Sequence, residues 1–351
     1  MTFQPERLIF ARKRRQITQT DLARTLGIVP KTIQRYEHGQ EVPKDERLAQ
    51  LASTLGFPAE FFLDSRPLPE IPAPALSFRA YSKLKARVRD NAVAVAQLSV
   101  GIEAMLTEHF ELPELEVPDV REEASSPVHA AQIVRSTWAL GSGPISNMVH
   151  LLEAKGVRLF SLAEDAKDVD AFCFWHDAKP FVVLNRAKSA ERGRFDAAHE
   201  LGHLAMHRHI DFRNRDVERE ADQFAGEFLV PAASLETQIP SLITLETVKK
   251  LKKFWSVSAM AMVRRLKDIG KLTDWNYRSM CIDLASAGYR THEVDGMPTN
   301  ETSSLLAGMI SSEGVTIAEL SRGLHVRAAD LSPLVFDLPH ARGPLRLVRS
   351  A

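Results

Sequence analysis

Residues 199–203 read His-Glu-Leu-Gly-His, and the flanking residues predict that this stretch lies in a helix. Side chains four residues apart lie one above the other on one face of a helix, so His199 and His203 can bind a single metal ion. Glu200 lies between the two histidines and can reach a water molecule on that ion. The stretch therefore predicts a metal centre with a carboxylate beside it.

The chemistry expected of this pattern is hydrolysis. Neutral imidazole nitrogens suit Zn²⁺, which lowers the pKa of bound water from about 15.7 to about 7. A neighbouring carboxylate can then take the proton, as in zinc metallo-endopeptidases with the pattern His-Glu-x-x-His. We therefore expect Zn²⁺ as the cofactor and Glu200 as the general base. Because five residues of this kind also arise by chance in helices whose histidines only pack, the rest of the chain has to support the site.

A catalytic zinc site needs a third protein ligand and keeps a fourth position open. Downstream, residues 217–231 carry apolar side chains at helical spacing, and Glu218 and Glu220 flank that apolar stripe. Helix phasing alone does not choose between these two glutamates.

Three short apolar runs before the metal helix predict strands at residues 157–162, 171–175 and 181–184, the last two joined as a hairpin. A strand at 171–175, if it lies at the edge of the cleft, could pair with an extended substrate segment and hold it over the metal.

The composition is that of a globular protein with two or three domains, because the chain has 351 residues, 44% of them hydrophobic and 26% charged. It contains no apolar run of about 18 residues and no signal-peptide pattern. Cys173 and Cys281 are the only cysteines, too few for a disulfide framework. These features predict a cytoplasmic protein without a membrane partner, whose metal ligands are His, Glu or Asp.

Positive charge is concentrated in the first 35 residues, which hold eight Lys and Arg against two Asp and Glu, although the whole chain has no net charge. This asymmetry favours a localised anionic partner over an evenly charged surface. Thr18 can cap a helix that begins at Gln19, and Gly27 can supply the turn that follows. Pro30 can begin the next helix, predicted at 31–36. A helix, a glycine turn and a second helix are typical of a helix-turn-helix.

The stretch Gln19-Thr-Asp-Leu-Ala-Arg-Thr-Leu-Gly-Ile, followed by Lys31-Thr-Ile-Gln-Arg-Tyr-Glu-His-Gly, resembles the DNA-binding domain of Xre-type regulators, over about residues 4–64. The resemblance implies that residues 31–36 form the recognition helix on a double-stranded DNA operator. The side chains placed for phosphates and base edges are Gln19, Lys31, Thr32, Gln34 and Arg35.

Three further expectations concern this N-terminal domain. The run Arg12 to Arg15 is expected to contact phosphates, whose contribution to affinity depends on salt. A homodimer is expected, because helix-turn-helix proteins commonly bind paired half-sites. Such folds also serve as protein-binding modules, which is the alternative to DNA binding.

His-Glu-Leu-Gly-His together with Glu220-Ala-Asp-x-Phe-Ala and the Leu-Val-Pro that ends at residue 231 resembles the ImmA/IrrE family of metallopeptidases, over about residues 128–235. The resemblance implies a gluzincin-like site that cuts repressor proteins, so the expected substrate is a protein of repressor type. It implies His199, His203 and Glu220 as the metal ligands and Glu200 as the general base. Glu220 ranks above Glu218 because it directly precedes Ala-Asp.

Two more polar residues are candidates for supporting roles. His207 lies one further helical turn along the face of His203, where it could contact substrate or steady the site, or only pack. Asp222 could orient a histidine ligand through a hydrogen bond, or lie on a solvated helix face.

We expect a multidomain, mostly α protein. Its predicted parts are a helix-turn-helix DNA-binding domain at 1–65, a Pro-rich linker at 66–78, a helical connector at 79–127, an α+β zincin-like metallopeptidase domain with a small sheet at 128–235, a helical region at 236–290 and a small helical module at 291–351.

The favoured function is a DNA-binding transcriptional regulator that carries a zinc peptidase. One alternative is a transcription factor whose peptidase-like domain is a sensor or a dimerisation domain without proteolytic activity. Another is self-cleavage in the linker at 66–78, which would free the DNA-binding domain. No feature of the sequence excludes these alternatives, because a complete set of metal ligands shows the capacity to bind metal and not turnover.

Overall fold

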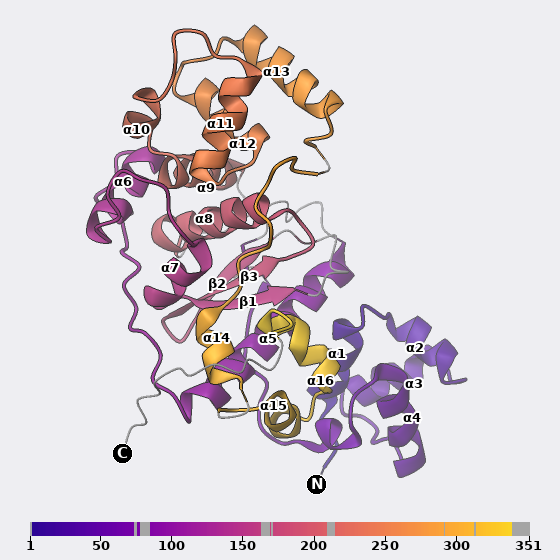
Figure 1. The fold of residues 1–351 in the computed structure, drawn as a ribbon. Coiled ribbons are helices and arrows are strands. Elements are labelled where there is room, and N and C mark those ends of the chain that lie inside the picture. The colour runs from indigo at the N-terminus through magenta and orange to yellow at the C-terminus, as the bar shows by residue number, and fades with distance from the viewer. Residues whose placement is uncertain are drawn as a thin grey trace.

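The computed structural model describes residues 2–73, 76–77, 85–162, 169, 171–208, 215–290, 292–311 and 314–338. Within them the chain is mostly α-helical with one small sheet, which confirms the expected fold class. Residues 79–84 of the predicted connector and 339–351 of the predicted C-terminal module lie outside the described residues. Figure 1 shows that the N-terminal and C-terminal helices share one end of the molecule.

The N-terminal domain is a compact set of short helices around an apolar core. Thr18 Oγ1 accepts a hydrogen bond from the Asp21 N–H at 3.0 Å, which caps the second helix as expected. Leu22, Ile33 and Leu51 are fully buried and hold the helices together. The elements are α1 (Pro5–Arg14), α2 (Gln19–Thr25), α3 (Pro30–Glu37), α4 (Asp45–Leu55) and the 3₁₀ helix η1 (Ala59–Leu63).

Helix α5 (Ala86–Thr107) packs against α1, against the sheet and against the C-terminal helices. The C-terminal helices also contact the N-terminal domain directly, because Arg15 pairs with Asp330 and Arg66 donates a hydrogen bond to the Gly323 carbonyl at 2.5 Å. The C-terminal elements are α14 (Ser304–Met309), α15 (Ile317–Leu324), α16 (Ala328–Leu331) and the 3₁₀ helix η4 (Ser332–Val335).

The sheet has three strands in the order β1-β3-β2. Strand β1 (Arg158–Leu162) is parallel to β3 (Lys179–Asn185), and β2 (Phe172–His176) is antiparallel to β3. Asp177 and Ala178 join β2 to β3 with φ values of 47° and 60°, which is the backbone of a type I′ hairpin turn. The expected hairpin is confirmed, and β2 is an edge strand of the described sheet.

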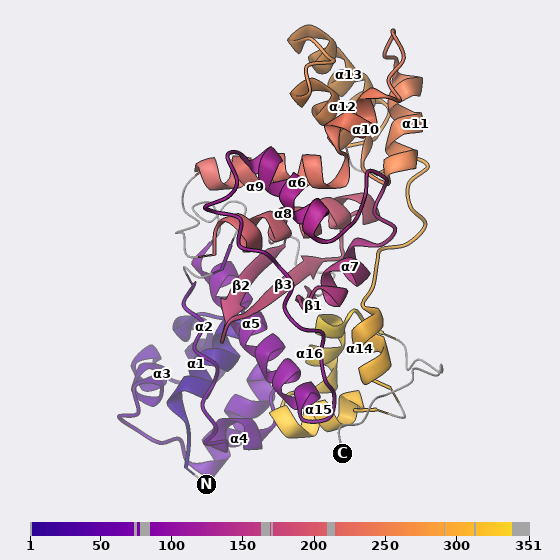
Figure 2. The ribbon, with the colours of Figure 1, turned by 90° about the vertical axis from the view of Figure 1, so that its left-hand side faces the viewer.

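Helices cover the sheet in layers. Figure 2 shows α8 (Ala190–Met206) lying over the sheet, with α9 (Arg215–Leu229) and α6 (Pro127–Thr137) beyond it, and α7 (Met148–Ala154) lies beside β1 and α8. A Cβ at Gly202 would lie 3.0–3.2 Å from atoms of Phe224. The absence of a side chain at Gly202 therefore allows α9 to pack closely on α8.

A group of helices after α9 packs on its outer side. Arg265 forms a buried ion pair with Glu227 of α9 and donates a hydrogen bond to the Val230 carbonyl at 2.9 Å. No helix in the described part of the chain is long and apolar enough to span a membrane. The elements of this group are α10 (Ala232–Glu236), α11 (Leu245–Trp255), α12 (Ala259–Asp268) and α13 (Asp274–Ser286).

Candidate metal centre and nucleic-acid interface

Helices α8 and α9 bring three potential metal ligands together. The Nε2 atoms of His199 and His203 lie 3.0 Å apart, one helical turn from each other on α8. Glu218 of α9 approaches them, with Oε2 3.5 Å from His199 Nε2 and Oε1 3.4 Å from His203 Nε2. Among the described residues, these three form the group of His, Cys, Asp and Glu side chains whose ligand atoms lie within 4.8 Å of one another.

The geometry fits a zinc ion. Ligand atoms about 2.0–2.1 Å from a tetrahedral zinc lie about 3.3 Å apart, close to the separations found here. Both carboxylate oxygens of Glu218 are buried and accept no hydrogen bond within the described residues, which is costly unless a cation compensates it. Burial raises the pKa of Glu218, but the two nearby imidazoles outweigh burial and hold that pKa well below its ordinary value.

Glu218, and not Glu220, lies beside the two histidines, which differs from the ligand set that the family resemblance implies. Glu220 does not face the two histidines of the motif; its Oε2 lies 3.0 Å from His207 Nε2. Residues two apart on a helix point about 200° away from each other, so only one of the two glutamates can face His199 and His203. Phe224 of α9 lies against Gly202 of α8, and in this packing Glu218 is the glutamate that faces the two histidines.

A second set of polar side chains holds the imidazole rings. Asp222 Oδ1 lies 2.9 Å from His199 Nδ1, and His207 Nδ1 lies 3.1 Å from His203 Nδ1. Contacts at Nδ1 leave Nε2 available for a metal and fix the orientation of each ring. Burial lowers the pKa of both His203 and His207 to about 4, so both rings are neutral near pH 7.

One sequence signal could have identified Glu218. Asp222 follows Glu218 by four residues, so the two carboxylates share a face of α9. A carboxylate that orients His199 from that face implies that the ligand comes from the same face.

Glu200 lies on the side of α8 that faces β2 and is fully buried. Its Oε2 accepts a hydrogen bond from the Ser77 hydroxyl at 2.6 Å. Burial raises the pKa of Glu200 to about 7, although His199 and the Ser77 hydroxyl act in the opposite direction. A pKa near the working pH is what general base catalysis requires. The sequence analysis did not identify Ser77, because no pattern in the Pro-rich linker connects it with a residue 123 positions away.

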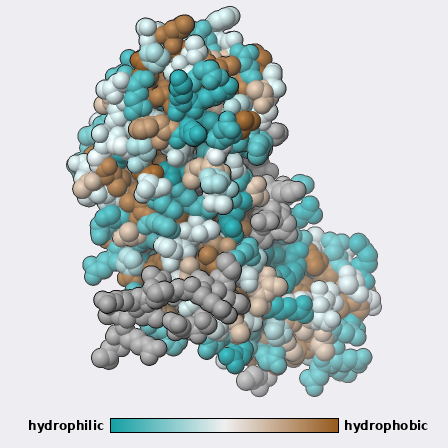
Figure 3. Space-filling model, in the orientation of Figure 1, coloured by the Kyte–Doolittle hydropathy of each residue, from teal (hydrophilic) through white to brown (hydrophobic). Residues whose placement is uncertain are grey.

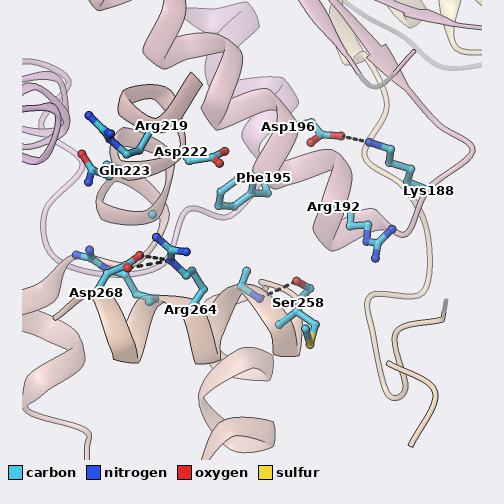
Figure 4. Close-up of a pocket in the computed structure, with 14 residues that line it drawn as sticks. Lys188, Arg192, Phe195, Asp196, Arg219, Asp222, Gln223, Ser258, Arg264 and Asp268 are labelled. Atoms are coloured by element: carbon cyan, nitrogen blue, oxygen red, sulfur yellow. Dashed lines mark hydrogen bonds and ion pairs between the residues drawn. The ribbon is translucent and has the colours of Figure 1, made fainter. Parts of the chain in front are cut away.

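A cavity of about 740 Å³ lies between α8, α9 and α12, next to the metal ligands (Figure 4). Phe195, Arg219 and Arg264 line it, together with Asp222, the residue that contacts His199. The Asp222 side chain is 43% exposed. A small molecule in this cavity would therefore touch the carboxylate that orients a metal ligand.

The predicted recognition helix, α3, presents polar side chains to solvent. Lys31, Gln34 and Arg35 are exposed and Thr32 is half-buried, whereas Ile33 packs inside. Figure 3 shows hydrophilic residues over much of the N-terminal domain on the face that is drawn. The exposed side of α3 is therefore available to a partner.

Gln19 has a different environment. It is half-buried at the start of α2, and its Nε2 donates a hydrogen bond to Glu37 Oε2 at 2.6 Å. Its amide is therefore held by the protein, at the edge of the surface that α3 presents.

The side chains of the basic run at the end of α1, Arg12 to Arg15, contact other residues of the protein. Arg12 pairs with the buried Glu37 at 2.6 Å, and Arg15 pairs with Asp330 of α16. Lys13 lies 3.0 Å from Asp90, and Arg14 donates a hydrogen bond to Asn91 at 2.9 Å. Each side chain of the run has a partner within the molecule, because the end of α1 faces α5 and α16. The expectation that Arg12 to Arg15 contact phosphates stays a prediction.

Two family models match the chain, one in each of the regions described above. A family model described as a helix-turn-helix domain matches residues 6–65. The model described as the IrrE N-terminal-like domain, of the M78 peptidases, matches residues 152–267. The second match begins in α7 and ends in α12, so it includes the sheet, α8, α9 and the cavity. Among curated proteins, none matches the chain.

Proposed function

The chain joins an Xre-type helix-turn-helix domain to a domain of the ImmA/IrrE peptidase family, and we propose that it is a DNA-binding regulator that cleaves a repressor-type protein with zinc held by His199, His203 and Glu218. The observation that carries this proposal is the position of Glu218 beside the two histidines. Its buried carboxylate oxygens lie 3.5 Å from His199 Nε2 and 3.4 Å from His203 Nε2, and they have no other hydrogen-bond partner among the described residues. The operator would be double-stranded DNA bound by α3, with a homodimer on paired half-sites.

The residues of the centre divide the work of hydrolysis. Zinc, when bound, supplies Lewis-acid chemistry that polarises a peptide carbonyl and makes water more acidic. Glu200 takes the proton of the attacking water and can pass it to the leaving amine, because its pKa of about 7 suits both steps. Asp222 and His207 keep the two imidazoles oriented throughout.

Zinc analysis of purified full-length protein tests the ligand set. We expect one zinc per chain in the wild type and in Glu220→Ala, and a loss of stoichiometric zinc in Glu218→Ala. The opposite result, zinc lost only in Glu220→Ala, would restore the ligand set implied by the family resemblance.

Cleavage tests the reaction itself. The zinc-loaded protein is incubated with repressor-type proteins encoded beside it, with and without a chelator. Fragments that form only without the chelator support the peptidase function. Identical fragments in both samples would contradict it, because hydrolysis would then not require the metal.

A second function, metal-dependent sensing without cleavage, is favoured by the way the domains touch. Helix α5 carries Asp90, which pairs with Lys13 of the DNA-binding domain, and Glu103, which lies 2.9 Å from Lys179 of β3. One helix therefore contacts both functional domains. Operator affinity that changes on zinc removal, with no fragment from any repressor, would favour this second function.

A further inference from the structure

Residues 76 and 77 of the Pro-rich linker lie against the edge of β2 that faces away from β3. The Ser77 N–H donates a hydrogen bond to the Cys173 carbonyl at 3.0 Å, and the Cys173 N–H donates to Ser77 Oγ at 2.9 Å. Leu76 and Ser77 are buried, with 0% and 1% of their surface exposed. This part of the linker is therefore packed inside the peptidase domain and is not an open connection.

The same Ser77 hydroxyl reaches the predicted general base. It donates its single proton to Glu200 Oε2 at 2.6 Å while it accepts the hydrogen bond from Cys173 N. A hydroxyl group has one donor and two acceptor positions, so the three groups satisfy one another. Ser77 thus connects the edge of the sheet with the carboxylate of the metal centre.

A substrate would need the same groups. An extended peptide that binds by strand addition uses the backbone N–H and carbonyl of an edge strand, and on β2 those of Cys173 bond to Ser77, which also contacts Glu200. Ser77 already occupies both. It is the side-chain hydroxyl of Ser77 that meets Glu200, so this contact holds the base and does not present a peptide bond to it.

We propose that residues 76–77 are a built-in inhibitor that occupies the substrate position on β2 and must leave before another peptide can bind beside Glu200. This inference rests on the proposed peptidase function. It also defines the substrate as an extended segment with an apolar residue followed by a small or hydroxyl-bearing one, as in Leu76-Ser77.

Two hydrogen bonds anchor the first residues of the linker to helices α1 and α5. Arg7 of α1 donates a hydrogen bond to the Arg66 carbonyl at 2.8 Å, and Gln97 of α5 donates to the Pro69 carbonyl at 2.8 Å.

Peptide binding to the zinc-free full chain tests the proposal without turnover. The probe is a fluorescein-labelled peptide with the sequence of residues 71–80, Ile-Pro-Ala-Pro-Ala-Leu-Ser-Phe-Arg-Ala, and the readout is fluorescence anisotropy. Ser77→Pro removes both the N–H and the hydroxyl, whereas Ser77→Ala removes only the hydroxyl. Ser65→Ala changes an exposed serine of the same region and is the matched control.

We expect the peptide to bind at least about tenfold more tightly to Ser77→Pro than to the wild type. If residues 76–77 occupy the site about 90% of the time, the apparent affinity of the wild type for the peptide is reduced by that factor. Ser77→Ala should show a smaller gain, and it keeps the test valid if the proline variant does not fold. Ser65→Ala should behave as the wild type. Equal affinity for all four proteins would overturn the proposal.

Turnover of the same peptide by the zinc-loaded proteins separates this proposal from the peptidase function. Tighter binding to the Ser77 variants without cleavage by any protein supports the occupied site and contradicts the peptidase function. Cleavage by the wild type and Ser77→Pro at equal rates, with equal binding, overturns the inhibitor and leaves the peptidase function in place. A fragment cut within 66–78 of the wild-type chain would also overturn it, because the segment would then be a substrate.

Discussion

His199 and His203 of α8 face inward and contact other polar side chains, whereas Lys31, Gln34 and Arg35 of α3 face solvent. His199 and His203 are held at Nδ1 by Asp222 and His207, and their exposed surface is 2% and 1%. Lys31 and Arg35 of α3 are exposed. A buried polar group needs its hydrogen-bond partners within the fold, but an exposed one can bond to water until a ligand binds. The proposed metal ligands are therefore already oriented by contacts within the protein, whereas the polar side chains of α3 point into solvent.

The same contrast separates the arginines within the N-terminal domain. Arg12 is bound to Glu37, whose side chain is only 4% exposed, while Arg35 pairs with Glu41 at the surface. Arginines of one domain thus differ in setting: Arg12 pairs with a buried carboxylate, and Arg35 lies at the surface, where we propose that it contacts DNA. Four experiments test this contrast between buried and exposed polar groups.

The largest effect is expected from Glu200→Gln. The substitution removes the proton acceptor but retains the shape of the side chain, so the rate of zinc-dependent cleavage should fall about 10²–10⁴-fold. Zinc content should stay at the wild-type level, because Glu200 is not among the three grouped ligands. Initial rates with a fluorogenic peptide measure the effect. A variant that keeps more than half of the wild-type rate would exclude Glu200 as the base.

The next effect concerns the support of the metal ligands. Asp222→Ala should lower zinc affinity about 10–100-fold, because His199 loses the carboxylate that orients it. Glu220→Ala should lower it less, since Glu220 touches His207 and is one contact further from the centre. Competition with a chromophoric chelator measures both affinities. A larger loss for Glu220→Ala would place that glutamate at the metal.

Arg12→Ala should reduce the free energy of unfolding by about 2 kcal/mol, because Glu37 loses a charged partner in a buried setting. Arg35→Ala is the exposed counterpart and should change it by less than about 0.5 kcal/mol. Urea denaturation followed by circular dichroism gives both values. If Arg12→Ala instead unfolds like the wild type and only weakens operator binding, Arg12 contacts DNA after all.

The smallest effect is expected from Lys31→Ala in α3. Loss of one phosphate contact should weaken operator binding several-fold and reduce the slope of log K against log salt by about 1. Lys249→Ala, in α11, serves as the control and should leave the slope unchanged. Titrations at several salt concentrations measure the slopes. Identical slopes for both variants would remove Lys31 from the DNA surface.

Local patterns in the sequence predicted several of these features well. The cap at Thr18, the β2–β3 hairpin and the helix that holds His199 and His203 all depend on neighbouring residues, and each lies in the structure close to its expected position. The hydrogen bond between Asp222 and His199 was one of two alternatives that the sequence left open, and the structure shows it.

Features that depend on distant residues were missed. The position of Glu218, and not Glu220, beside the two histidines follows from how α9 packs on α8. The contact of Ser77 with Glu200 joins the linker to a helix in another domain. The spacing of Glu218 and Asp222 is a local signal for the first of these features, whereas no local spacing links Ser77 with Glu200, 123 positions away, so that contact could not be predicted without the packing of the chain.

The sequence by itself determined the helices and strands that local patterns predict, and it placed His199, Glu200 and His203 close together on one helix. The reason is that hydrogen bonds within a helix and the alternation of polar and apolar residues act over a few positions. Only the tertiary structure decided which carboxylate of α9 lies beside His199 and His203, which arginines pair with buried carboxylates, and that Ser77 contacts Glu200. Those outcomes depend on how whole elements rotate and pack until buried polar groups are paired, and that condition involves the entire chain at once.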